Sequence, residues 1–112
     1  MTNKEVITNF YKEFFNEHIV ESATKYVRED YIQHNPGVEQ GRAGLMEAFA
    51  EKFKEHPEFA LQIKFMIEED NMVAVYLKNV DEQGNTRCRV VDIYRLEDGK
   101  LAEHWDVLQP VS

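Results

Sequence analysis

The hydrophobic period of the chain changes once, near residue 59, and this change constrains the fold more than any other feature of the sequence. Before it, apolar residues recur at the three- and four-residue spacing of amphipathic helices. After it, they alternate with polar residues, as in half-buried strands. A parallel α/β fold would need helices and strands to alternate along the chain. The observed order instead predicts an α+β fold, with three helices packed on one face of an antiparallel sheet.

Three helices are expected in the first half of the chain. Thr2 and Glu5 have the spacing of a capping box, and the apolar residues that follow them share one helix face: Val6, Ile7, Phe10, Tyr11, Phe14 and Phe15. A shorter helix is expected over about 20–27 and a third over about 42–56. The intervening segment 31–37 contains Asn-Pro-Gly, which indicates a turn.

Four strands are expected in the second half. In the first of them, one face carries Phe59, Leu61, Ile63, Phe65 and Ile67. The expected strands cover about 59–67, 73–77, 86–96 and 100–108. Polar turn segments separate them, so the sequence favours an antiparallel meander.

The last two expected strands form a hairpin whose register decides which side chains meet. A three-residue loop over 97–99 would place Asp92 opposite His104. One face then carries Cys88, Val90, Asp92, Tyr94, Ala102, His104, Asp106 and Leu108; the other carries Val91, Ile93, Arg95, Leu101, Glu103, Trp105 and Val107. A two-residue turn at Asp98-Gly99 would pair Asp92 with Trp105 instead. We favour the first register because it collects the ionisable groups on one face.

Composition narrows the classes of function. The 112 residues suit a single domain, 1–112, with 43% hydrophobic residues to build its core. The net charge of −8 disfavours nucleic acid and anionic membrane surfaces as partners. No apolar run approaches the roughly 20 residues of a membrane span, and the polar N-terminus is unlike a signal peptide. With Cys88 as the single cysteine, cytoplasmic residence is the expected location.

Two stretches of the sequence resemble a known family. They are Tyr31-Ile-Gln-His-Asn-Pro36 and the segment from Val91 to Pro110, which contains Asp-Ile-Tyr-Arg, a glycine turn and Glu-His-Trp-Asp. Both are similar to the SnoaL-like, polyketide cyclase-like group of the nuclear transport factor 2-like superfamily, and the resemblance covers essentially the whole chain. It implies a cone-shaped α+β roll of the cystatin-like type, in which a curved sheet encloses a deep pocket.

The resemblance also implies an activity. Polyketide cyclases of this group close a ring by aldol condensation without a metal or cofactor, and their acid/base aspartate corresponds to Asp106. A carboxylate in an apolar pocket is suited to moving a carbon-bound proton. The expected catalytic residues are Asp106, His104, Asp92 and His34, and the expected substrate-binding residues are Asn35, Tyr11 and Tyr94. The expected ligand is a small hydrophobic or carbonyl-containing compound.

Other readings of the same residues stay open. His34, His104, Asp92 and Asp106 are chemically suitable metal ligands, but no tight metal-binding motif is present, so we expect neither metal nor cofactor. The fold also occurs in proteins that only bind a ligand or dimerise, so a non-catalytic domain is the alternative function. Members of the group commonly dimerise sheet against sheet, which implies a homodimer through the face bearing Ile93 and Trp105.

Overall fold

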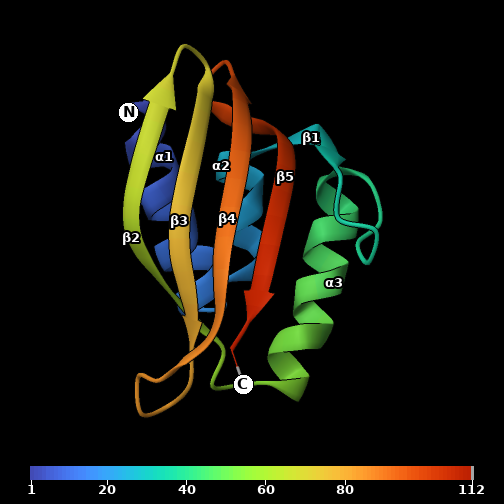
Figure 1. The fold of residues 1–112 in the computed structure, drawn as a ribbon. Coiled ribbons are helices and arrows are strands. Elements are labelled where there is room, and N and C mark those ends of the chain that lie inside the picture. Colours follow the sequence, from blue (N-terminus) through green and yellow to red (C-terminus); the bar gives the residue numbers. More distant parts are fainter. Residues whose placement is uncertain (112) are drawn as a thin grey trace.

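The computed structural model describes residues 1–111 and shows helices on one face of a curved five-stranded sheet (Figure 1). The elements in chain order are α1 (Asn3–Phe10), the π-helix η1 (Tyr11–Asn16), the 3₁₀ turn η2 (Val20–Ser22), α2 (Ala23–Tyr26), β1 (Val27–Gln33), α3 (Gly41–Glu55), β2 (Ala60–Glu69), β3 (Met72–Val80), β4 (Thr86–Glu97) and β5 (Lys100–Pro110). The strand order is β1-β5-β4-β3-β2. The predicted α+β class, with three helices on a curved sheet, is confirmed.

The sheet is mixed, because β1 pairs with β5 in parallel while the other neighbours are antiparallel. The sequence predicted a turn over 31–37 and no strand before it. That prediction is wrong for the first part of the segment. Tyr31 and Gln33 are buried, whereas Ile32 between them is 41% exposed, which is the alternation of a strand. A strand of this kind forms by pairing with a segment some seventy residues away, so local turn signals obscure it.

The first helix begins as expected and then widens. Thr2 Oγ1 accepts the Glu5 N–H at 3.1 Å and Glu5 Oε1 accepts the Thr2 N–H at 2.8 Å, which completes the capping box. In η1 the Glu17 N–H donates to the Lys12 carbonyl at 2.9 Å, a five-residue spacing. π-Helical turns of this kind are often found at functional sites. Here the wider helix carries three buried aromatic side chains, Tyr11, Phe14 and Phe15, directly after the buried Phe10 at the end of α1.

The register of the closing hairpin differs from the one predicted. A two-residue turn at Asp98-Gly99, with both φ angles positive (53° and 75°), pairs Leu96 with Leu101. An irregularity beyond this pair then shifts the ladder by one residue, so that Asp92 lies opposite Asp106 and not opposite His104. Since the total shift is two residues, the ionisable groups still share one face. Leu101 was expected on the outer face but is fully buried.

A second bulge changes the outer face of the sheet. The β2–β3 ladder shifts between Ile63 and Phe65, so Phe65 and Ile67 turn outward and are 55% and 64% exposed. The expectation that they share the inner face with Ile63 is therefore wrong. Figure 1 shows α1 and α2 behind the sheet and α3 beside β1, with no helix over the near face of the sheet.

The interior between helices and sheet is rich in aromatic rings. Phe14 and Phe15 pack edge-on at 5.0 Å, and Phe15 also contacts Phe49 of α3 at 5.1 Å. These contacts join η1 to α3 and close one wall of a cavity. Within residues 1–111, no helix is both long and apolar enough to cross a membrane.

Candidate active site

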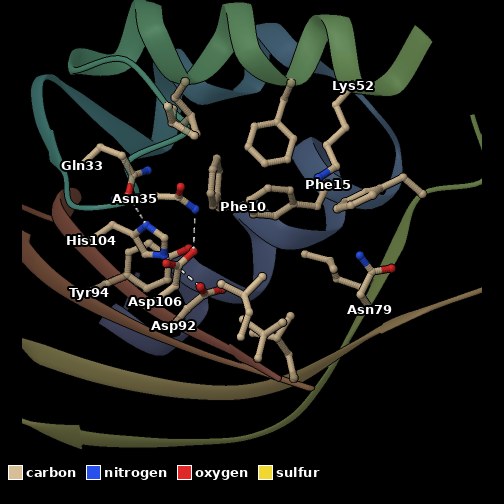
Figure 2. A pocket seen from close by; sticks show the side chains of 18 of the residues that line it. Phe10, Phe15, Gln33, Asn35, Lys52, Asn79, Asp92, Tyr94, His104 and Asp106 are labelled. Atoms are coloured by element: carbon tan, nitrogen blue, oxygen red, sulfur yellow. Dashed lines mark hydrogen bonds and ion pairs between the residues drawn. The ribbon is translucent and has the colours of Figure 1, made fainter. Parts of the chain in front are cut away.

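A cavity with about 680 Å³ of empty space, part of it open to solvent, lies between η1, α3 and the inner face of the sheet. Its walls are mostly apolar and aromatic. The polar side chains gather at two ends: Gln33, Asn35, Asp92, Tyr94, His104 and Asp106 at one, Lys52 and Asn79 at the other (Figure 2). An apolar cavity with a few convergent polar groups is the usual form of a small-molecule site.

The β4–β5 ladder brings three ionisable residues together. Tyr94 pairs with His104, and Asp92 pairs with Asp106. Single ligand atoms of Asp92, His104 and Asp106 all lie within 4.8 Å of one another. Asp92 and His104 are buried, at 6% and 7% exposure, whereas Asp106 is half-buried. The predicted clustering of these three residues is therefore what the structure shows, although through different cross-strand pairs.

Hydrogen bonds define the proton positions around His104. The backbone N–H of Asn35 donates to Gln33 Oε1 at 3.1 Å, which identifies that atom as the amide oxygen. His104 Nδ1, 2.7 Å from the same oxygen, must therefore carry a proton and donate it. The opposite nitrogen, Nε2, lies 2.8 Å from Asp92 Oδ1, so one more proton lies between these two atoms. The His104–Asp92 pair has no net charge whether that proton is on nitrogen or on oxygen.

Two tyrosines support the same aspartate from the side of the helix. The Tyr11 hydroxyl donates to Asp92 Oδ2. Because that proton is used, the Tyr94 hydroxyl donates to the Tyr11 oxygen at 2.8 Å. Burial, and then the charge of Asp92, raises the pKa of Tyr11 and of Tyr94 well above the ordinary value. Both phenols therefore remain protonated donors. Tyr11 does not line the cavity, so it supports Asp92 and does not reach a ligand directly.

Asp106 has the most accessible carboxylate of the cluster. Asn35 Nδ2 donates to Asp106 Oδ2 at 3.0 Å. The orientation of this amide is defined by the Gly37 N–H, which donates to Asn35 Oδ1 at 2.9 Å. Within residues 1–111, Asp106 Oδ1 has no hydrogen-bond partner, and the side chain lines the cavity. The site thus combines a neutral histidine–aspartate pair with one aspartate available for proton transfer.

His34 does not enter the cavity. It follows β1, where alternation turns it to the outer face, and its ring stacks on Trp105 at 4.9 Å. His34 Nε2 lies 2.8 Å from Glu103 Oε2, and this contact, followed by Arg95, lowers the pKa of Glu103. The expectation that His34 faces a substrate is therefore not met by the geometry. Trp105 lies on the outer face as expected.

Three cavity residues were missed by the sequence reasoning. Gln33 orients His104, and the signal for it was the alternation of Tyr31, Gln33 and Asn35 within a segment read as a turn. Lys52 and Asn79 lie on α3 and β3, and no local pattern in the sequence marks them as neighbours of a cavity.

Asp92, His104 and Asp106 are also the group of residues in 1–111 that could hold a metal ion. Both nitrogens of His104 and both oxygens of Asp92 already make hydrogen bonds inside the protein. A metal ion would have to break the His104–Asp92 contact to use either residue as a ligand. The donor set therefore fits a hydrogen-bonded acid–base cluster better than a metal centre.

Comparisons with known proteins agree with this architecture. The SnoaL-like polyketide cyclase family matches residues 5–112. IdmH of Streptomyces antibioticus, a proposed polyketide cyclase, superposes with a TM-score of 0.78 at 18% identity, covering 97% of this chain and 93% of that one. A proposed SnoaL-like isomerase from Agrobacterium tumefaciens gives 0.81 at 13% identity, covering 97% and 99%. An NTF2-like protein of unknown function from Cytophaga hutchinsonii gives 0.78 at 22% identity, covering 98% and 92%.

No curated protein matches the chain. Because the family match spans almost the whole sequence, the chain belongs to the SnoaL-like polyketide cyclase family. These three solved structures are each less than 25% identical to it, so they establish the shared fold.

Proposed function

We propose that the cavity binds a small carbonyl compound and catalyses cofactor-free proton transfer at the carbon next to the carbonyl, in an aldol cyclisation or an isomerisation. One observation carries this proposal. Asp106 is held through Oδ2 by Asn35, while its Oδ1 is available inside an apolar cavity beside the neutral His104–Asp92 pair. A carboxylate positioned in this way can act as a general base and then as a general acid.

In the proposed step, Asp106 Oδ1 accepts a proton from the α carbon, and the electrons of the C–H bond move onto the carbonyl oxygen to form an enolate. Asn35 Nδ2 has a second N–H besides the one given to Asp106, and it donates to the enolate oxygen. In a cyclisation, the enolate carbon bonds to a second carbonyl carbon of the same molecule, and Asp106 returns the proton to the new alkoxide. In an isomerisation, the proton returns to a different carbon.

Replacement of Asp106 by Asn tests the proposal. The assay does not require the natural substrate. It uses NMR to follow the exchange of the α protons of 2-tetralone, a small apolar ketone, for deuterium in D₂O. We expect the wild-type protein to accelerate exchange over buffer and Asp106→Asn to lower that acceleration by about 10²-fold or more, because general base catalysis contributes about 10²–10⁴.

The matched control is Asp98→Asn, in the turn of the same hairpin, where the side chain is 86% exposed. It should leave the exchange rate unchanged. A rate for Asp106→Asn equal to the wild-type rate would remove Asp106 from the chemistry.

A second function, ligand binding without chemistry, is favoured by one observation. Within residues 1–111, every buried side-chain nitrogen and oxygen already has a hydrogen-bond partner. The His104–Asp92 cluster is therefore complete without a substrate, as in a structural polar network. A wild-type protein that binds 2-tetralone yet does not accelerate its exchange would support this function.

A further inference from the structure

The two polar ends of the cavity differ in charge. In Figure 2, Asp92, His104 and Asp106 lie at one end and Lys52 and Asn79 at the other, with aromatic side chains between them. Lys52 is the single lysine or arginine among the cavity-lining residues of 1–111. A ligand that spans the cavity would therefore meet a carboxylate at one end and an ammonium group at the other.

Aromatic rings hold the Lys52 ammonium group at the cavity. Lys52 Nζ lies 5.8 Å from the ring centre of Phe49 and 5.2 Å from that of Phe59, and both rings line the cavity. Cation–π attraction at such distances favours this position over one extended into water. In Figure 2 the Lys52 side chain runs from α3 toward the cavity. The charge is thus kept beside the apolar wall.

Neither polar group at this end has a partner inside the described part of the chain. Lys52 Nζ makes no ion pair with a carboxylate of residues 1–111, although the protein has a net charge of −8. The Asn79 amide on β3 lies at the same end in Figure 2, and its side chain makes no hydrogen bond within those residues. An ammonium group and an amide N–H₂ together supply donors for an anion.

We infer that the ligand of this cavity is a carboxylate-bearing apolar compound whose carboxylate binds Lys52 and Asn79, with its carbonyl segment directed toward Asp106. The inference rests on the proposed use of the cavity as a small-molecule site. The carboxylate of Asp106 repels an anion at its own end, so this arrangement also sets the orientation of the bound ligand. A single lysine with one amide suits a monoanion; a phosphate dianion usually takes arginines or several backbone N–H groups.

The inference is tested with two compounds of equal size, 2-naphthylacetate and 2-naphthylacetamide, titrated calorimetrically into the full-length protein. We expect the acid to bind about fivefold more tightly than the amide, as for a partly exposed ion pair. Lys52→Met should remove this preference by weakening the acid alone, and raised salt should reduce it in the wild-type protein.

Lys54→Met is the control, since Lys52 and Lys54 are both exposed on the same helix and only Lys52 lines the cavity. It should keep the wild-type preference. The inference is overturned if the wild-type protein binds the acid no more tightly than the amide, or if it binds neither compound. It is also overturned if the Lys52→Met protein keeps the preference for the acid. The 2-tetralone assay with Asp106→Asn reports on the proton transfer separately, because that ketone carries no anionic group.

Discussion

Gln33 is the residue on which the proton positions of the site depend. Its oxygen accepts hydrogen bonds from the Asn35 backbone and from His104 Nδ1. Its own backbone is held by Gln40, whose side chain accepts the Gln33 N–H at 2.9 Å and donates to the Gln33 carbonyl at 2.6 Å. Gln33 thus directs the other nitrogen of His104 toward Asp92, and we interpret it as a positioning residue.

Replacement of Gln33 by Leu should leave the His104 Nδ1–H buried without an acceptor. Such a loss costs about 1–3 kcal/mol of unfolding free energy, which urea titration would measure. The pH dependence of 2-tetralone exchange should shift as well, because His104 Nδ1 has lost its acceptor, whereas Gln33→Glu should keep an acceptor there and most of the stability. Gln62→Leu, at an exposed site on β2, is the control. A Gln33→Leu protein with the stability and pH profile of wild type would contradict this role.

At the scale of elements, α3 packs closely against the loop that precedes it, and this loop holds β1 in place. Gly44 is buried in the first turns of α3, and a Cβ atom there would lie 2.5 Å from the Glu39 carbonyl oxygen. Gln40, the residue after Glu39, forms hydrogen bonds with the backbone of Gln33 through its side chain. Helix packing is therefore linked through one short loop to the residue that orients His104.

Gly44→Ala is expected to destabilise the protein by about 1–3 kcal/mol, the usual cost of inserting a methyl group into a packed site. Alanine alone would favour the helix by about 1 kcal/mol over glycine, so the sign of the change is informative. Thermal or urea unfolding measures it, with Ala43→Gly at the adjacent exposed position as the comparison. A Gly44→Ala protein that is more stable than wild type would show that the loop moves freely.

At the scale of the molecule, the uncovered face of the sheet is the main unexplained surface. Cross-strand pairing forms two apolar rows on it: Phe65, Tyr76, Val91 and Val107 in one, Ile67, Ala74, Ile93 and Trp105 in the other. Contiguous apolar surface of this kind usually marks an interface. We propose that a second copy of the chain covers it, as the family resemblance implies.

Sedimentation velocity should show a wild-type dimer and a monomeric Ile67→Glu protein. Ile67 is 64% exposed, so the fold should tolerate the change while the buried charge disrupts the interface. Ile19→Glu, at a position 44% exposed next to η2, should remain dimeric. A monomeric wild-type protein at tens of micromolar would contradict the proposal.

The helical spacing of apolar residues before residue 59 and their alternation after it were enough to predict the α+β class. They also predicted the helices near 3–16 and 41–55 and the strands after residue 59. These features are local, because an amphipathic face and a capping box depend on residues within a few positions. The grouping of Asp92, His104 and Asp106 was also predictable, since a shift of two residues keeps side chains on the same face.

Tertiary structure decided what depends on partners far along the chain. β1 exists because β5 pairs with it, and this pairing turns Gln33 inward and His34 outward. The bulge in β2 exposed Phe65 and Ile67, which simple alternation placed inside. Lys52 reached the cavity only through the packing of α3. The sequence by itself therefore determined which groups are available for chemistry, and long-range pairing and bulges determined which of them meet.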